Sequence, residues 1–128
     1  MGRYLLDTHT AIWFFDNSTA LSSVANKIIR SGTNSVYLSV ASAWELAIKI
    51  GIGKMEFDGK AAGFLRLAEI CDITVIPILP EHLSVLETLP FIHRDPFDRL
   101  IIATAQAEQM TLITDDDNVA RYDVPIIW

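Results

Sequence analysis

Short apolar runs alternate along the chain with longer segments in which apolar residues recur at helical spacing. Runs of strand length occupy residues 3–6, 36–38, 73–76 and 111–113, and helical segments occupy residues 8–15, 22–31, 40–50, 60–69, 80–86 and 95–109. A final run, residues 124–128, is expected at a sheet edge because Pro125 has no backbone N–H to donate. The alternation predicts an α/β fold with three layers, α/β/α, and a mostly parallel central sheet.

Length and composition indicate a single globular domain. The chain has 128 residues, of which 51% are hydrophobic and 20% charged, and we expect one domain over residues 1–128. No apolar run approaches the roughly 20 residues of a membrane helix, and the N-terminus reaches Asp7 too early for a secretory signal. Cys71 is the sole cysteine, which excludes an internal disulfide and favours a reducing cytoplasm.

The formal net charge of −6 differs from that of most nucleic-acid-binding proteins, which carry an excess of Lys and Arg. A nucleic-acid substrate is still compatible with this charge if many acids gather at a metal site, because the cation then supplies positive charge for a phosphate. The charge also suits a basic protein partner.

Asp7 directly follows the first predicted strand. Ligands of open α/β sheets bind beyond the carboxyl ends of the strands, so this position favours a functional role. It suits an N-cap for the helix that begins at Thr8 equally well. On position alone both interpretations stay open.

Glu45 lies within a helical segment that is apolar on nearly every side, which predicts burial. It is too far from the helix start to act as a cap, and a buried carboxylate requires a cation or a base nearby. Lys49, one turn later, offers an i,i+4 ion pair worth only about 0.2–0.5 kcal/mol on a solvated face. We favour a metal-site role for Glu45 over this pair.

Asp95 and Asp98 flank the start of the last long helix. Asp95 suits the N-cap, Pro96 the first helical position, and Asp98 the first turn, where the helix dipole favours an acid. Capping explains Asp95 well and Asp98 less completely, because the rest of this helix is apolar. An acid at the head of a buried helix is well placed for a ligand.

Thr114 and three consecutive acids, Asp115, Asp116 and Asp117, follow the strand at residues 111–113. Mutual repulsion of the acids disfavours the fold unless a cation or solvent relieves it. Taken alone, a solvated acidic turn is the better explanation of this segment.

In a parallel sheet the acids that follow strands or begin helices converge at one edge. Carboxylate oxygens as the sole ligands suit Mg²⁺ or Mn²⁺. The histidines, His9, His82 and His93, are scattered and give no zinc-ligand spacing, and the chain has no phosphate-binding glycine loop.

Four motifs, in order along the chain, resemble those of the PIN-domain ribonucleases. They occupy residues 5–9 (LLDTH), 43–45 (AWE), 93–103 (HRDPFDRLIIA) and 112–116 (LITDD). The most similar group is the VapC-like toxins of bacterial toxin–antitoxin pairs, and the resemblance extends over essentially the whole chain.

The resemblance implies a PIN-like fold and a Mg²⁺- or Mn²⁺-dependent endoribonuclease, a hydrolase of RNA phosphodiesters. By motif register, the residues that match the family's catalytic acids are Asp7, Glu45, Asp98 and Asp116. Asp7 and Asp98 are expected to bind the metal directly, and the other two directly or through water. Which of Asp115, Asp116 and Asp117 faces the metal is left open. Residues expected to support the site are Thr8, Asp95, Arg99, Thr114 and Asp115.

The resemblance also implies a cognate antitoxin, which would inhibit the enzyme by inserting a basic residue among the acids. Residues 13–15 and 51–57 offer apolar surface for an antitoxin segment or a homodimer contact, although core packing accounts better for at least two of the aromatics. No membrane association is expected.

Two other functions remain to be distinguished from a nuclease. A non-catalytic protein-interaction module could keep the fold and the acidic edge, and it would show no metal-dependent cleavage. A phosphotransfer or receiver domain also places Asp after strands, but it requires a second acid close to Asp7 and a lysine where this chain has Thr114.

Overall fold

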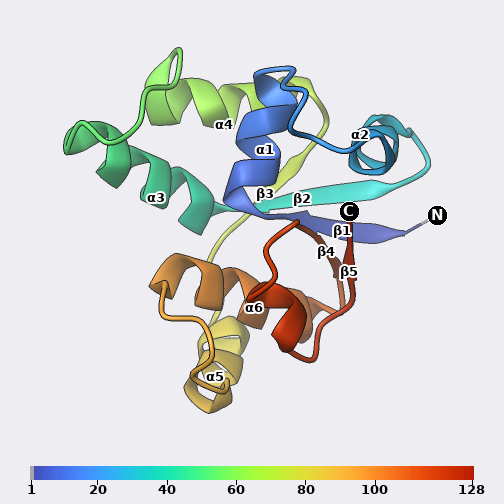
Figure 1. The fold of residues 1–128 in the computed structure, drawn as a ribbon, viewed down its shortest axis with the longest axis vertical. Coiled ribbons are helices and arrows are strands. Elements are labelled where there is room, and N and C mark those ends of the chain that lie inside the picture. Colours follow the sequence, from blue (N-terminus) through green and yellow to red (C-terminus); the bar gives the residue numbers. More distant parts are fainter. Residues whose placement is uncertain (1) are drawn as a thin grey trace.

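The computed structural model describes residues 2–128 and contains a five-stranded sheet between two layers of helices (Figure 1). The strands are β1 Arg3–Leu6, β2 Ser35–Ser39, β3 Thr74–Ile76, β4 Thr111–Ile113 and β5 Ile126–Ile127. They lie in the order β3-β2-β1-β4-β5, and all four strand pairs are parallel. The central position belongs to β1, and β5 forms an edge as predicted.

Helices cover both faces of the sheet (Figure 1). One layer consists of α1 Thr8–Phe15, α2 Ser23–Arg30, α3 Val40–Gly51 and α4 Lys60–Ile70, and the other consists of α5 Pro80–Thr88 and α6 Pro96–Glu108. A short 3₁₀ helix, η1 Val119–Arg121, follows β4. The predicted three-layer α/β/α architecture with a parallel sheet is confirmed.

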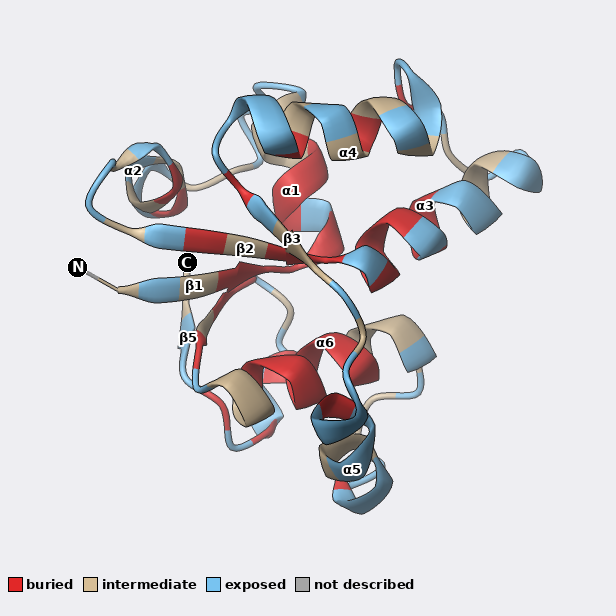
Figure 2. Cartoon of the chain, turned by 180° about the vertical axis from the view of Figure 1, so that it is seen from behind, coloured by how far each residue is buried: buried red, intermediate tan, exposed pale blue. Residues whose placement is uncertain are grey.

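The two central leucines of β1 show how the sheet separates two cores. Leu5 and Leu6 are both fully buried, but adjacent strand residues point to opposite faces. Leu6 packs in the core beneath α1–α4, and Leu5 packs in the core beneath α5 and α6. Figure 2 shows the buried residues concentrated in the middle strands and along the inner side of α6. Packing on both faces fixes where the strands end.

The predicted element bounds differ from the structure mainly near the C-terminus. The strand expected at residues 124–128 is limited to Ile126–Ile127. Pro125 contributes its carbonyl, which accepts from the N–H of Leu112, while Val124 is buried in the core ahead of the strand. The apolar character of Val124 therefore reflects core packing rather than sheet pairing. The helix predicted at residues 80–86 continues to Thr88.

Within residues 2–128, no helix combines the length and apolar character needed to cross a bilayer.

Candidate functional site

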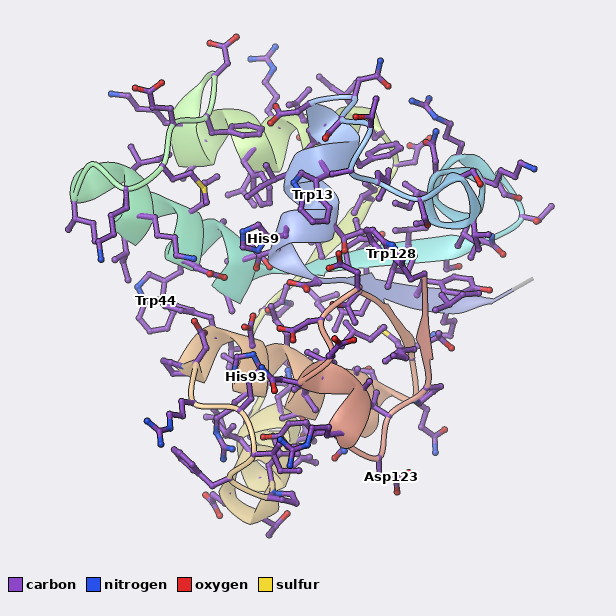
Figure 3. All side chains as sticks on the ribbon, in the orientation of Figure 1. His9, Trp13, Trp44, His93, Asp123 and Trp128 are labelled. Carbon is purple, nitrogen blue, oxygen red and sulfur yellow. The ribbon has the colours of Figure 1, made fainter. Side chains whose placement is uncertain are left out.

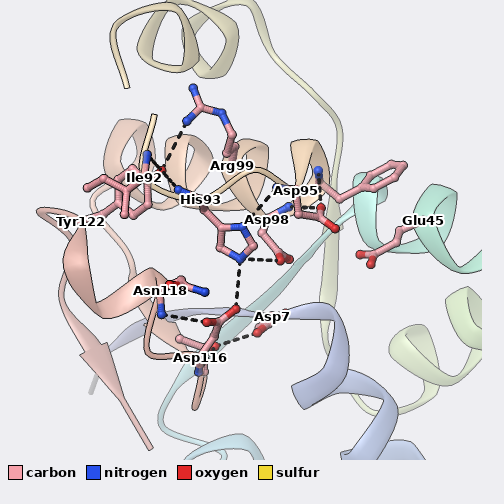
Figure 4. A network of polar contacts seen from close by, with 12 residues as sticks. Asp7, Glu45, Ile92, His93, Asp95, Asp98, Arg99, Asp116, Asn118 and Tyr122 are labelled. Carbon is pink, nitrogen blue, oxygen red and sulfur yellow. Dashed lines mark hydrogen bonds and ion pairs between the residues drawn. The ribbon is translucent and has the colours of Figure 1, made fainter. Parts of the chain in front are cut away.

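Four carboxylates gather where β1, β2 and β4 end. Asp7 follows β1 directly, Asp116 lies three residues after β4, and Glu45 belongs to α3, which follows β2 without a loop. Asp98 lies in the first turn of α6. Figure 4 shows these side chains around a common space. Parallel strands bring their carboxyl ends to one edge, so the convergence expected from the sequence is present in the structure.

Asp7 occupies the N-cap position of α1, but its side chain does not make a capping hydrogen bond. The carboxylate is 8% exposed, and its Oδ2 accepts a 2.7 Å hydrogen bond from the Thr114 hydroxyl. Burial raises the pKa of Asp7 above its usual value, and the hydrogen bond from Thr114 partly opposes this shift. The nearby His9 amide also lowers the pKa, although it does not meet the geometry of a cap. Helix capping therefore does not account for this acid.

The start of α6 separates the roles of Asp95 and Asp98. One oxygen of Asp95 accepts from the N–H groups of Phe97 at 2.8 Å and Asp98 at 3.1 Å, which is the predicted N-cap. Burial raises the pKa of Asp98 to about 7, and the charges of Asp7, Asp95 and Glu45 add to the shift. Asp98 is thus a carboxylate held in its charged form at neutral pH only at a cost in free energy.

The raised pKa of Asp98 predicts how stability depends on pH when no divalent cation is present. The folded state binds the Asp98 proton more tightly than the unfolded state, whose pKa is near 3.8, so the free energy of unfolding falls as pH rises from about 4 to 7. The difference between these two pKa values corresponds to roughly 4 kcal/mol, and solvent screening reduces it to about 2 kcal/mol. In EDTA at pH 8, Asp98→Asn should therefore be more stable than the wild type by about 2 kcal/mol, measured by urea unfolding.

At pH 4 the same variant should lose this advantage, and Asp123→Asn, at an exposed acid, should match the wild type at both pH values. Equal stability of Asp98→Asn and wild type at pH 8 would show that neither burial nor the neighbouring acids disfavour the charged form of Asp98 in the folded protein.

Glu45 is the most deeply buried of the four acids, at 3% exposure. Its Oε2 accepts a 2.6 Å hydrogen bond from the Lys49 ammonium, so the i,i+4 pair forms. Its Oε1 has no hydrogen-bond partner among residues 2–128, although the carboxyl group is directed toward the other acids (Figure 4). The pair with Lys49 thus satisfies one oxygen and leaves the other for a ligand.

The residues present fit a divalent cation. A buried, unpaired carboxylate oxygen beside three further acids is costly without positive charge nearby. Mg²⁺ and Mn²⁺ bind preferentially to oxygen ligands of this kind. Asp7, Glu45, Asp98 and Asp116 would supply those oxygens.

Among the three consecutive acids, Asp116 is the one tied into the cluster. Its Oδ2 lies 3.2 Å from Nε2 of His93, and its Oδ1 accepts from the N–H of Asn118 at 2.9 Å. Its own N–H donates to the Thr114 hydroxyl. Asp115 and Asp117 are exposed. Asp115 still lines a pocket of about 270 Å³ with Asp7, His9, Trp13 and Asp116.

Thr8 and Thr114 have different surroundings. The Thr114 hydroxyl bridges Asp7 and the backbone of Asp116, which links the ends of β1 and β4. The Thr8 hydroxyl shares a 2.8 Å hydrogen bond with Ser42 and so joins α1 to α3. Thr114 orients two of the acids directly, whereas Thr8 joins the helices that carry them.

Arg99, expected to support the site, does not lie among the carboxylates in this structure. Its guanidinium donates to the carbonyls of Pro90 at 2.9 Å and Leu89 at 3.3 Å, and to the Tyr122 hydroxyl at 3.3 Å. Figure 4 shows it pointing away from the acids. Arg99 follows Asp98 on α6, and one residue of helix turns the side chain by about 100° onto another face.

His93 belongs to the cluster, although sequence spacing gave no reason to place it there. Its Nε2 lies 3.0 Å from Oδ2 of Asp98 and 3.2 Å from Oδ2 of Asp116. These three groups lie close enough together to hold a metal ion. The only sequence signal was its position within the motif of residues 93–103. Spacing alone could not reveal it, because Asp116 comes from a distant part of the chain.

Comparisons with known proteins agree with this fold. The model of the PIN domain family matches residues 4–125. Similar solved structures include VapBC2 from Rickettsia felis bound to a DNA fragment from its promoter, with 18% identity, a TM-score of 0.74, and coverage of 98% of this chain and 97% of that chain. DNA-bound VapBC from Salmonella typhimurium has 16% identity, a TM-score of 0.69, and coverage of 99% and 98%.

VapBC-5 from Mycobacterium tuberculosis, a member of the VapBC family of toxin–antitoxin systems, has 20% identity, a TM-score of 0.60, and coverage of 99% of this chain and 98% of that chain. At these identities the likeness to solved structures establishes the fold. No curated protein sequence matches the chain. The family match, which extends over nearly the whole length, shows that the chain belongs to the PIN domain family.

Proposed function

We propose that this PIN domain is a metal-dependent endoribonuclease and acts as the toxin of a toxin–antitoxin pair. The observation that carries the nuclease proposal is the convergence of four acids with an unpaired, buried oxygen on Glu45. The similarity to structures described as VapBC complexes supports the toxin assignment.

The four acids bind the cation in two ways in this proposal. Asp7 and Asp98 bind Mg²⁺ or Mn²⁺ directly, and Glu45 and Asp116 bind it directly or through water. The cation supplies a Lewis acid that stabilises negative charge on the phosphodiester and makes a nucleophilic water more acidic. Thr114 fixes Asp7 through its hydroxyl, and Asp95 fixes the head of α6, so the acids are held in place before RNA binds.

We expect the purified chain to cleave RNA from a mixed-sequence panel in Mg²⁺ or Mn²⁺, and the rate to fall by at least about 100-fold in EDTA, because the cation stabilises the transition state. Gel analysis of end-labelled RNA measures the rate, and excess Mg²⁺ should restore it.

Protein shown to be folded and free of an inhibitory partner, yet inactive under every condition, would favour the non-catalytic interaction module instead. Cleavage that persists in EDTA would contradict the metal requirement.

An antitoxin is the proposed inhibitory partner. The acidic cluster and the net charge of −6 favour a basic segment, whose positive group could take the place of the cation among the acids. The exposed thiol of Cys71 suits a reducing compartment, and we propose the cytoplasm as the site of action.

A second copy of the chain is the proposed partner for the outer face of α3. Four apolar residues spaced four apart are exposed along this face: Val40, Trp44, Ile48 and Ile52. Trp44 projects from α3 (Figure 3), and its ring meets that of Phe97 on α6 edge-on, with the ring centroids 4.8 Å apart. The stripe contains no charge, which suits a two-fold contact because each residue there lies near its own symmetry mate. Phe14 and Phe15 pack against the core, which is the explanation expected for at least two of these aromatics.

Ile48→Glu should convert a dimeric wild type into a monomer, since it places two like charges near the symmetry axis of an apolar contact. We expect dimer dissociation constants to rise by on the order of 100-fold, measured by sedimentation. Val24→Glu on α2, another exposed apolar position, is the control and should leave the dimer unchanged. A wild type that stays monomeric at high concentration would refute this contact.

A further inference from the structure

His93 is anchored between two carboxylates that come from separate parts of the chain. Its Nε2 contacts Asp98 on α6 and Asp116 in the loop after β4, at 3.0 and 3.2 Å (Figure 4). The ring is largely buried, with 13% of the side chain exposed. A nitrogen in this place can act in two ways: it can bind a cation through its lone pair, or it can donate a proton to the acids.

The other ring nitrogen decides between these roles. Nδ1 of His93 accepts a 3.2 Å hydrogen bond from the N–H of Asp95. A nitrogen that accepts an N–H carries no proton, so the proton of the neutral ring resides on Nε2. Nε2–H then donates to Asp116, lies 3.0 Å from the Asp98 carboxylate, and has no lone pair to offer a metal.

The backbone of His93 reinforces this orientation. Its N–H donates to the Tyr122 hydroxyl at 2.7 Å, and the N–H of Ile92 donates to the same oxygen at 3.0 Å. Tyr122 is buried. The ring is therefore held at its backbone by Tyr122 and at Nδ1 by Asp95, which directs Nε2–H toward the two acids.

We propose that His93 is a positioning residue: its Nε2–H holds Asp116 by a hydrogen bond and lies close beside Asp98, so that the two acids receive the divalent cation, while His93 itself is not a ligand. The inference rests on the proposed metal-dependent function. Two neighbouring carboxylates repel each other, and a shared donor offsets that repulsion and fixes their directions. Hydrogen bonds of this kind to ligating groups typically change metal affinity by roughly 10–100-fold. The ligand set then contains oxygen alone, which suits Mg²⁺ as well as Mn²⁺.

Two substitutions separate a donor from an inert side chain. The amide of Gln can place an N–H near the position of Nε2, whereas Leu fills the space without a donor. We expect His93→Leu to raise the dissociation constant for Mn²⁺ by about 10–100-fold in calorimetric titration, and His93→Gln to recover affinity to within about 5-fold of the wild type. Far-UV circular dichroism identifies any variant that fails to fold. If His93→Leu does not fold, the Mn²⁺ affinity of His93→Gln still tests the proposal.

Two spectroscopic measurements on the full chain test the role without reference to activity. Pulsed electron paramagnetic resonance of bound Mn²⁺ should show no ¹⁴N coupling from a coordinated imidazole in the wild type. Two-dimensional ¹H–¹⁵N spectra of the metal-free protein should show the His93 ring protonated at Nε2, with its signals assigned by their loss in His93→Gln.

Coupling to an imidazole nitrogen that disappears in His93→Gln would make His93 a ligand and overturn the proposal. Unchanged Mn²⁺ affinity in His93→Leu, or a His93 ring protonated at Nδ1 alone, would also overturn it while leaving the metal site intact. Failure of the wild type to bind Mn²⁺ or Mg²⁺ at all would instead refute the metal-dependent function on which it rests.

Discussion

Asp7→Asn is expected to lower the rate of metal-dependent RNA cleavage by on the order of 1000-fold or more without unfolding the protein. Asp7 ends the central strand of the sheet and is expected to be a direct metal ligand. Asn keeps the size of the side chain and an oxygen that can accept from Thr114, but it removes the negative charge that attracts the cation. A loss of several kcal/mol in transition-state stabilisation corresponds to a rate change of this size.

The rate is measured on end-labelled RNA at saturating Mg²⁺, with unfolding in urea as the test of structure. Stability in EDTA should stay the same or rise, because burial raises the pKa of the Asp7 carboxyl and thus makes its charge unfavourable in the folded state. Asp123→Asn removes one negative charge at a position away from the acidic cluster (Figure 3) and should retain wild-type rates. A folded Asp7→Asn protein with wild-type activity would remove Asp7 from the proposed catalytic residues.

The fold and the convergence of acids could be predicted because both depend on local features of the sequence. The order of strands and helices follows from apolar periodicity, and alternating elements favour a parallel sheet. A parallel sheet brings its carboxyl ends to one edge, so Asp7 and the acids after β4 could be expected at the same edge. That β1 and β4 are neighbours is known only from the structure. Helix caps were equally local: Asp95 caps α6 as expected, and Ser39 caps α3 in the same way.

Contacts between segments distant in the chain could not be predicted from sequence patterns. Nothing local distinguishes Asp116 from Asp115 and Asp117. Its hydrogen bonds to Thr114 and His93 do so in the fold. The position of His93 depends likewise on Tyr122, which lies 29 residues later and accepts its N–H.

Arg99 is a residue whose sequence neighbour suggests a role that its contacts in the fold do not show. In sequence it adjoins Asp98, and a cation next to an acid suggests phosphate binding. In the structure it anchors the segment between α5 and α6, because it holds the carbonyls of Leu89 and Pro90 and its guanidinium stacks over the Phe91 ring at 4.4 Å. The same segment carries His93, so in this structure Arg99 is connected to the site through the backbone.

This role predicts a large loss of stability in Arg99→Ala. The guanidinium is 9% exposed and donates three hydrogen bonds. Its removal leaves the carbonyl of the buried Leu89 without this donor, takes one of two donors from the Pro90 carbonyl, and leaves Phe91 without its cation. Each unmet buried group costs about 1–3 kcal/mol, and the cation–π contact adds about 0.5–1 kcal/mol. We expect the free energy of unfolding to fall by about 3 kcal/mol, measured by urea unfolding in EDTA.

Arg94→Ala, at an exposed arginine in the same segment, is the matched control and should change stability by no more than about 0.5 kcal/mol. Under conditions where Arg99→Ala remains folded, its Mn²⁺ affinity should decline modestly, because the segment that orients His93 is less firmly held. If Arg99 instead binds phosphate directly, Arg99→Ala should keep its stability and its Mn²⁺ affinity and lose only RNA binding. That second pattern, weaker RNA binding alone, would indicate that Arg99 contacts the substrate. The first would establish that the segment before α6 is held by a buried arginine so that His93 can hold the acids.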